Sequence, residues 1–197
     1  TDSQIITVTI TPVNDAPSLD VVGDQTMQEG GTKAILLSGS DIDEDVLTYS
    51  VTSGTNITSS IDGATITFSV SDDNWNGSEQ FTATVSDGEY TSDQTFTVTV
   101  DPVNDAPVLA TVSDVTFDEG TTGSVSLSAS DIDEDDLTYS VSEGTVITAT
   151  LDGSDITFSA PLDFNGSETF TVSVSDTEYT DSQIITVTIT PVNDAPS

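Results

Sequence analysis

The chain repeats itself with a period of about 90 residues, as the start positions 13, 103 and 192 of the pentapeptide Val-Asn-Asp-Ala-Pro show. Other landmarks return at the same step. Residues 41–45, Asp-Ile-Asp-Glu-Asp, return as 131–135, and residues 47–51, Leu-Thr-Tyr-Ser-Val, return as 137–141. A period of this length is that of a whole small domain, because the units of solenoids and propellers are shorter.

The repeat predicts two complete modules preceded by one additional strand. Residues 1–18 are identical to residues 180–197. We therefore expect residues 1–17 to be the last strand and linker of a preceding repeat, residues 18–106 to be the first complete repeat, and residues 107–196 to be the second. The same register predicts a parent protein that continues in both directions.

Apolar residues alternate with Ser and Thr through most of each module, which is the pattern of half-buried strands. No stretch has a convincing helical period. About seven such strands in each module predict an all-β fold of two tandem, seven-stranded Greek-key sandwiches. In the first module the alternating sets are Ile35 and Leu37; Leu47, Tyr49 and Val51; Ile66, Phe68 and Val70; Phe81, Ala83 and Val85; and Phe96, Val98 and Val100.

The charge is strongly one-sided, with 35 acidic residues, a single basic residue (Lys33), and a net charge of −34. A compact chain with this charge repels itself, and bound cations would offset the repulsion. Without a basic patch, nucleic acid and anionic membranes are poor partners. No apolar run approaches the length of a membrane span, so we expect no membrane insertion.

The acids gather in loops that a seven-stranded sandwich brings to its two ends. At one end the first–second and fifth–sixth loops carry Glu29, Asp73, Glu119 and Asp163. At the other end the second–third and sixth–seventh loops carry Asp41, Asp43, Asp87, Asp131, Asp133 and Asp176. The linkers add Asn14, Asp15, Asn104, Asp105, Asn193 and Asp194.

Where the two modules join, these positions predict a metal site. The expected set is Glu29, Asp73, Asn104, Asp105, Asp131, Asp133 and Asp176. Hard oxygen ligands suit calcium, and the chain has no His or Cys for zinc or copper. Glu44, Asp45, Glu134 and Asp135 either bind the ion or only add to the negative field, and the sequence leaves both interpretations open.

The linker, the Asp-x-Asp of the following module, and the loop Glu and Asp resemble the calcium-binding set of cadherin repeats. The whole module is similar to the bacterial cadherin-like repeats with Val-Asn-Asp-Ala-Pro junctions, which build giant surface adhesins exported by type I secretion. The resemblance implies calcium as cofactor, a cadherin/Ig-like sandwich, neighbouring repeats as partners, and an extracellular position at the cell surface. One departure is Pro102, which stands where cadherin linkers carry an Asp.

The function expected from this resemblance is that of a calcium-rigidified spacer in a large extracellular bacterial adhesin or surface protein. Two alternatives stay open. The repeated strand could join copies of the protein into a filament or sheath by β-strand exchange, or a module could bind glycan or a like module directly. We do not expect an enzyme, because the paired acids lie at sandwich ends without an aromatic-lined cleft, unlike those of a glycosidase.

Two local features have simpler explanations. The run Asp41-x-Asp43-x-Asp45 resembles the start of an EF-hand loop, but Val46 replaces the required Gly and Thr52 the required Glu. Trp75 has Phe164 as its counterpart, so we expect an apolar anchor beneath the Asn-Gly turn.

Overall fold

A computed structural model describes residues 2–193, and its regular structure within this range is entirely β-strand. No helix among these residues could cross a bilayer. The chain divides into two compact units, Thr1–Val103 (unit 1) and Asn104–Ser197 (unit 2), and each is described by itself.

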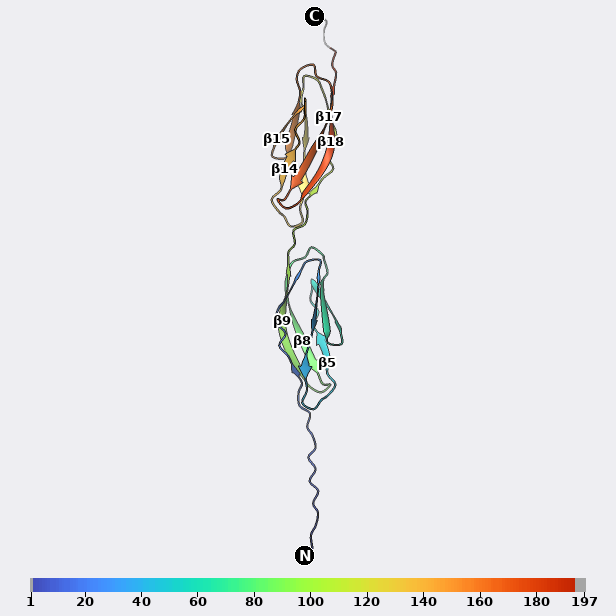
Figure 1. Ribbon diagram of the computed structural model, residues 1–197, viewed down its shortest axis with the longest axis vertical. Helices are drawn as coiled ribbons and strands as arrows, with labels where there is room; N and C mark the ends of the chain where they lie inside the picture. Colours follow the sequence, from blue (N-terminus) through green and yellow to red (C-terminus); the bar gives the residue numbers. More distant parts are fainter. Residues whose placement is uncertain (1, 194–197) are drawn as a thin grey trace. The chain divides into compact units, whose positions relative to one another are not determined.

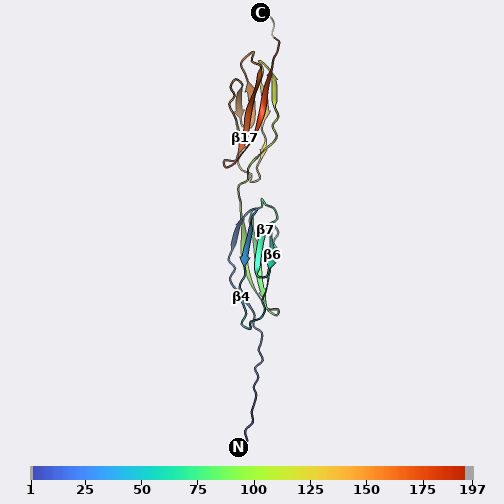
Figure 2. The ribbon, with the colours of Figure 1, turned by 45° about the vertical axis from the view of Figure 1, so that its right-hand side comes forward.

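Unit 1 is a two-layered β-sandwich. One sheet has the order β2-β9-β8-β5 and the other β3-β7-β6, with β1 and β4 forming a short pair. Figure 1 shows β5, β8 and β9 side by side, and Figure 2 shows β6 beside β7. The strands are β1 (Ser18–Leu19), β2 (Gln25–Gln28), β3 (Thr32–Leu36), β4 (Gly39–Ser40), β5 (Thr48–Val51), β6 (Ile57–Asp62), β7 (Thr65–Val70), β8 (Gly77–Ser86) and β9 (Thr91–Asp101).

Unit 2 repeats this architecture strand for strand. Its sheets have the orders β11-β18-β17-β14 and β12-β16-β15, with β10 and β13 as the short pair. The strands are β10 (Val108–Leu109), β11 (Val115–Asp118), β12 (Gly123–Ser126), β13 (Ala129–Ser130), β14 (Thr138–Val141), β15 (Thr148–Asp152), β16 (Asp155–Ser159), β17 (Gly166–Ser175) and β18 (Thr180–Thr190).

The nine segments of each unit correspond to seven strands, because the first two strands are each interrupted. In unit 1 the first strand forms the short pair with β4 as β1 and then joins the four-stranded sheet as β2, where Gln25 lies opposite Val98 in a parallel pairing with β9. The second strand is divided into β3 and β4. The prediction of two tandem, all-β, seven-stranded sandwiches is confirmed.

Both cores are built from the alternating residues. Phe68 and Phe81 are fully buried, with ring centroids 4.9 Å apart, and Phe96 lies 6.0 Å from Phe68. In unit 2 the corresponding pair is Phe158 and Phe170 at 5.0 Å, with the smaller Ile185 opposite Phe170.

Trp75 is the apolar anchor that its Phe164 counterpart predicts. It is partly buried and packs against the core of unit 1, as Phe164 does in unit 2. Its ring lies over Gly77, where an added Cβ would approach the ring to 2.8 Å and where φ is +145°. Both constraints require glycine at the start of β8.

Candidate metal centre

The loop between β4 and β5 concentrates negative charge at one end of unit 1. Asp41, Asp43 and Asp45 each place one carboxylate oxygen within 4.8 Å of the others. The loop is bent because Asp41 Oδ1 accepts hydrogen bonds from the backbone nitrogens of Asp43 at 2.8 Å and Asp45 at 3.4 Å. Glu44 has φ +62°, a left-handed conformation uncommon for residues with a side chain. We call residues 41–46 the acidic loop of unit 1.

Residues 131–136 form the matching acidic loop of unit 2. Asp131, Asp133 and Asp135 again place one oxygen each within 4.8 Å of the others. Asp131 Oδ1 accepts from the Asp133 nitrogen at 2.9 Å, and Glu134 has φ +61°. The same turn thus forms in both copies of the repeated sequence.

One carboxylate oxygen in each acidic loop is buried without a hydrogen-bond donor among residues 2–193. These atoms are Asp41 Oδ2 and Asp131 Oδ2. A buried carboxylate oxygen without a partner is costly, and a cation would remove that cost. Oxygens that bind calcium at 2.3–2.6 Å lie at most about 5 Å from one another, which agrees with the spacing of these clusters. The donor set therefore fits a calcium ion.

In unit 1 the linker that precedes β1 is hydrogen-bonded to the acidic loop and to the β8–β9 loop at this end. The Asn14 side-chain nitrogen donates to Asp87 Oδ2 at 2.9 Å, in the β8–β9 loop. The Asp15 backbone nitrogen donates to Asp43 Oδ2 at 2.8 Å. The linker of unit 1 is therefore hydrogen-bonded to both loops, and their role as an ion site stays a prediction.

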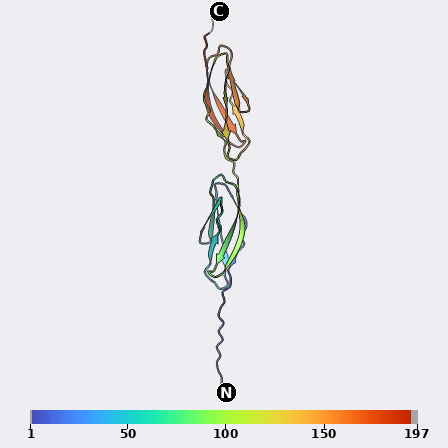
Figure 3. The same ribbon diagram turned by 180° about the vertical axis from the view of Figure 1, so that it is seen from behind.

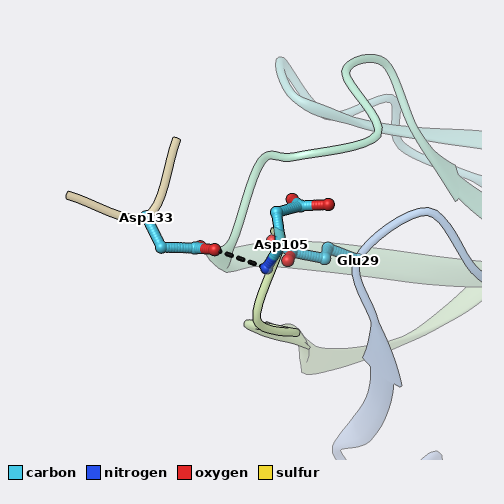
Figure 4. Close-up of side chains that lie close together, drawn as sticks. All are labelled: Glu29, Asp105 and Asp133. Carbon is cyan, nitrogen blue, oxygen red and sulfur yellow. Dashed lines mark hydrogen bonds between the residues drawn. The ribbon is translucent and has the colours of Figure 1, made fainter. Parts of the chain in front are cut away.

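Unit 2 has the same pair of contacts. The Asn104 side-chain nitrogen donates to Asp176 Oδ2 at 3.0 Å, in the β17–β18 loop. The Asp105 backbone nitrogen donates to Asp133 Oδ2 at 2.7 Å, the dashed line in Figure 4. Asp133 also belongs to the carboxylate cluster. An ion bound there would therefore contact the same side chain that accepts the hydrogen bond from the linker.

Asp176 is the buried carboxylate of this end, with 6% of its surface exposed. Burial raises its pKa, but backbone donation from Tyr179 at 2.6 Å, together with Asn104 and the Glu178 nitrogen, lowers the pKa below the ordinary value. In unit 1 the pKa of Asp87 is also lowered, chiefly by the Tyr90 backbone nitrogen. Both carboxylates therefore stay charged at neutral pH.

Asp135 shows the opposite effect. Its pKa is raised by desolvation and then by the negative charges of Asp131, Asp133, Asp176 and, last, Asp136. The acidic loop of unit 2 is thus a place where an additional negative charge is unfavourable, and where a cation would relieve the repulsion.

At the opposite end of each unit, a glutamate holds the chain as it leaves the last strand. Glu29 Oε1 accepts from the Val103 nitrogen at 2.7 Å, and Glu119 Oε1 accepts from the Val192 nitrogen at 2.6 Å. The second oxygen of Glu119 accepts from the Asn165 side chain at 3.2 Å. These glutamates act first as backbone anchors.

The structure thus brings together the predicted ligands of one end of each unit. These sets are Asn14, Asp15, Asp41, Asp43 and Asp87 in unit 1, and Asn104, Asp105, Asp131, Asp133 and Asp176 in unit 2. Glu29, Asp73, Glu119 and Asp163 lie on loops at the other end, where both aspartates are exposed. Asn193 follows β18, and Asp194 lies outside the described residues. The gathering of Glu29 and Asp73 with the acids of unit 2 stays a prediction.

Asp45 and Asp135, whose role the sequence leaves open, join the carboxylate clusters. The signal in the sequence is the third Asp at alternate spacing. The positive φ of the preceding glutamate turns the loop so that all three carboxylates converge.

Residues 14–101 and 104–190 each match the family model of the bacterial Ig domain. The chain belongs to the bacterial Ig domain family. Its two bacterial Ig domains are also similar in structure to two crystal forms of human protocadherin-24 EC1-2. One has a TM-score of 0.56 at 17% identity, covering 92% of this chain and 100% of that one, and the other has 0.58 at 18%, covering 90% and 100%. At this identity the likeness shows the fold, a cadherin-like arrangement of strands.

A search of curated protein sequences found no match. Bacterial Ig and cadherin-like domains are typically structural modules without catalytic activity, and they are usually extracellular.

Proposed function

We propose that the two bacterial Ig domains are calcium-rigidified spacer modules of a large extracellular bacterial adhesin or surface protein. The observation that carries the proposal is the duplicated acidic loop, with its three converging carboxylates and a buried oxygen that has no hydrogen-bond donor in the part of the chain that the structure describes. The chain has a net charge of −34, and Lys33 is its one basic residue. Its own side chains therefore offer little positive charge to neutralise these carboxylates.

The residues that would hold calcium within a unit are Asp41, Asp43 and Asp45, and in unit 2 Asp131, Asp133 and Asp135. Calcium would supply two positive charges to a cluster that otherwise repels itself. Following the cadherin resemblance, we propose that Glu29 and Asp73 contribute to the site of the following module, and Glu119 and Asp163 to the next one along an array. The partners of each module would then be its neighbouring repeats.

The contacts of the linker give the proposed site a mechanical consequence. Val103 is bound to Glu29 of unit 1, while Asn104 and Asp105 are bound to Asp176 and Asp133 of unit 2. Each of these three contacts uses a carboxylate of the predicted site. Calcium that neutralises and orders the carboxylates would therefore also order the linker and reduce its bending.

Small-angle scattering during a calcium titration tests this function. We expect the maximum dimension to become larger and better defined as calcium binds, and to be insensitive to calcium in D133A. The matched control is E143A, which removes an exposed carboxylate outside the predicted site. Scattering that is the same in calcium and in chelator would contradict the spacer function.

A further inference from the structure

The leading segment of unit 1, which precedes β1, has the sequence of a buried strand but none of its contacts. Residues 2–11 are identical to residues 181–190 of β18. In β18 the side chains of Ile185, Val187 and Ile189 are 0–2% exposed. No strand is assigned within residues 2–11, and in Figure 3 no other described segment of unit 1 runs beside this part of the chain.

The matching side chains in the leading segment are almost fully exposed. Ile6, Val8 and Ile10 are 84%, 82% and 88% exposed, although they correspond one by one to the buried residues of β18. An alternating strand with an unpaired edge and an uncovered apolar face has a strong tendency to pair. Its partner must offer both a strand edge and an open core.

We propose that residues 2–11 are a competent last strand for a second copy of the unit 2 sandwich, one whose own last-strand position is vacant. An intact unit 2 is a poor partner, because displacing β18 would expose the same three side chains that the incoming strand buries. The inference does not rest on the calcium function.

The register of β18 defines the place that the strand would take. In β18, Ile185 lies opposite Phe170 and Val187 opposite Glu168 of β17, and the other edge of β18 pairs in parallel with β11. Ile6 would therefore face Phe170, and Val8 would occupy the position of Val187. The strand would close the sheet between β17 and β11.

Two polar residues extend the match beyond the core. The Leu109 nitrogen donates to Asp181 Oδ2 at 2.8 Å, and the Val112 nitrogen donates to Gln183 Oε1 at 2.9 Å. The Gln183 side-chain nitrogen donates back to the Leu109 carbonyl oxygen at 2.9 Å. Asp2 and Gln4 carry the same groups at the same positions of the leading segment.

Unit 1 is the wrong acceptor for this strand. At the position of Ile185 it has Phe96, whose ring lies 6.0 Å from Phe68 and 6.2 Å from Phe81. Ile6 in that place would leave part of the aromatic cluster unfilled, and voids in a core are destabilising. The segment therefore selects the unit 2 type of sandwich.

The test uses the chain shortened to residues 1–179, which lacks β18 and keeps the leading segment. We expect unit 2 of one molecule to be completed by residues 2–11 of the next. Size exclusion with light scattering should show head-to-tail oligomers that grow with concentration, in calcium and in chelator alike. The variant I6D should abolish them. The matched control I5D should not, because Ile184, the counterpart of Ile5, is 74% exposed in β18.

A peptide of residues 2–13 provides the second arm. Added to the shortened I6D chain, it should form a one-to-one complex and restore β-sheet circular dichroism, whereas the same peptide carrying I6D should not bind. Monomers at every concentration together with no peptide binding would overturn the proposal. So would assembly that I5D and I6D weaken equally, because that result indicates non-specific association of apolar chains.

Discussion

The acidic loops of the two units have the same turn and differ by one charge. In both, one oxygen of the first Asp accepts from the backbone, and its other oxygen is buried with no donor among the described residues. The fourth residue of each loop has a positive φ. The last position is Val46 in unit 1, which is 84% exposed, and Asp136 in unit 2. The hydrogen bonds of Asp41 in unit 1 and of Asp131 in unit 2 therefore set the shape of the loop. The total charge of the loop differs between the units without changing that shape.

The largest effect that we expect is that of calcium removal on the thermal stability of the two units. At a hundredfold excess over Kd, one calcium site stabilises a domain by about 2.7 kcal/mol, which corresponds to roughly 10–20 °C in Tm. We expect chelation to lower the Tm of both units, and that of unit 2 by more, since its loop carries the extra charge. Trp75, the single tryptophan, follows unit 1 by fluorescence, and F164W in a W75F background follows unit 2. Melting curves that coincide with and without calcium would contradict the comparison.

Disrupting one carboxylate cluster at a time should show which unit each part of the calcium response belongs to. D43N should abolish most of the calcium-dependent stability of unit 1 and leave unit 2 unchanged, and D133N should do the reverse. Asn keeps an oxygen that can accept the Asp15 or Asp105 backbone bond. The charge-matched controls are D93N in unit 1 and E143Q in unit 2, both exposed and outside the clusters. A calcium response retained in both D43N and D133N would show that the ions bind elsewhere.

The pH dependence in chelator should distinguish the loops further. The pKa of Asp135 is raised, so protonation as the pH falls from neutrality through that pKa should stabilise unit 2. The pKa values of Asp87 and Asp176 are lowered, so each charged carboxylate stabilises its folded unit. That stabilisation is lost only at more acidic pH, below the ordinary Asp pKa of about 3.9. The Tm of unit 2 should therefore rise and then fall on acidification, and D135N should remove the rise. A steady fall from pH 7 in the wild type would contradict this order.

Exchanging the one differing residue should give the smallest effect. An exposed charge is worth about 0.2–1 kcal/mol, or roughly 1–8 °C in Tm for a domain of this size. In chelator, V46D should lower the Tm of unit 1 and D136V should raise that of unit 2. Shifts in the same direction would mean that something other than repulsion within the loop determines its stability.

Much of the fold could be predicted from alternation, because a residue that points inward in a two-layered sandwich must be apolar. Phe81, Ala83 and Val85 are an example, predicted as inward-facing and fully buried. The polar strand β2, with Met27 as its one buried residue, carries no such pattern. Its parallel pairing with β9 depends on the path of the first strand from its short pair with β4 into the four-stranded sheet, which is a tertiary effect.

The acidic positions of the site could also be predicted, because loop order alone decides which loops share an end of the sandwich. The individual partners could not. Glu79 accepts from the backbone nitrogens of Thr55, Asn56 and Ile57, and Asp24 accepts from the Thr97 nitrogen at 2.8 Å. Such acids stabilise the backbone and look the same in sequence as acids in an ion site. Only the path of the nearby backbone separates the two roles.

Calorimetric titration of the calcium-free chain with calcium tests the central claim most directly. We predict saturable binding with at least one ion for each acidic loop, weakened as the pH falls because protons compete for the carboxylates. The double variant D43N/D133N should lose this binding, while D93N/E143Q should retain it. Absence of saturable calcium binding to the wild-type chain, or binding that is equal in the two double variants, would contradict the account.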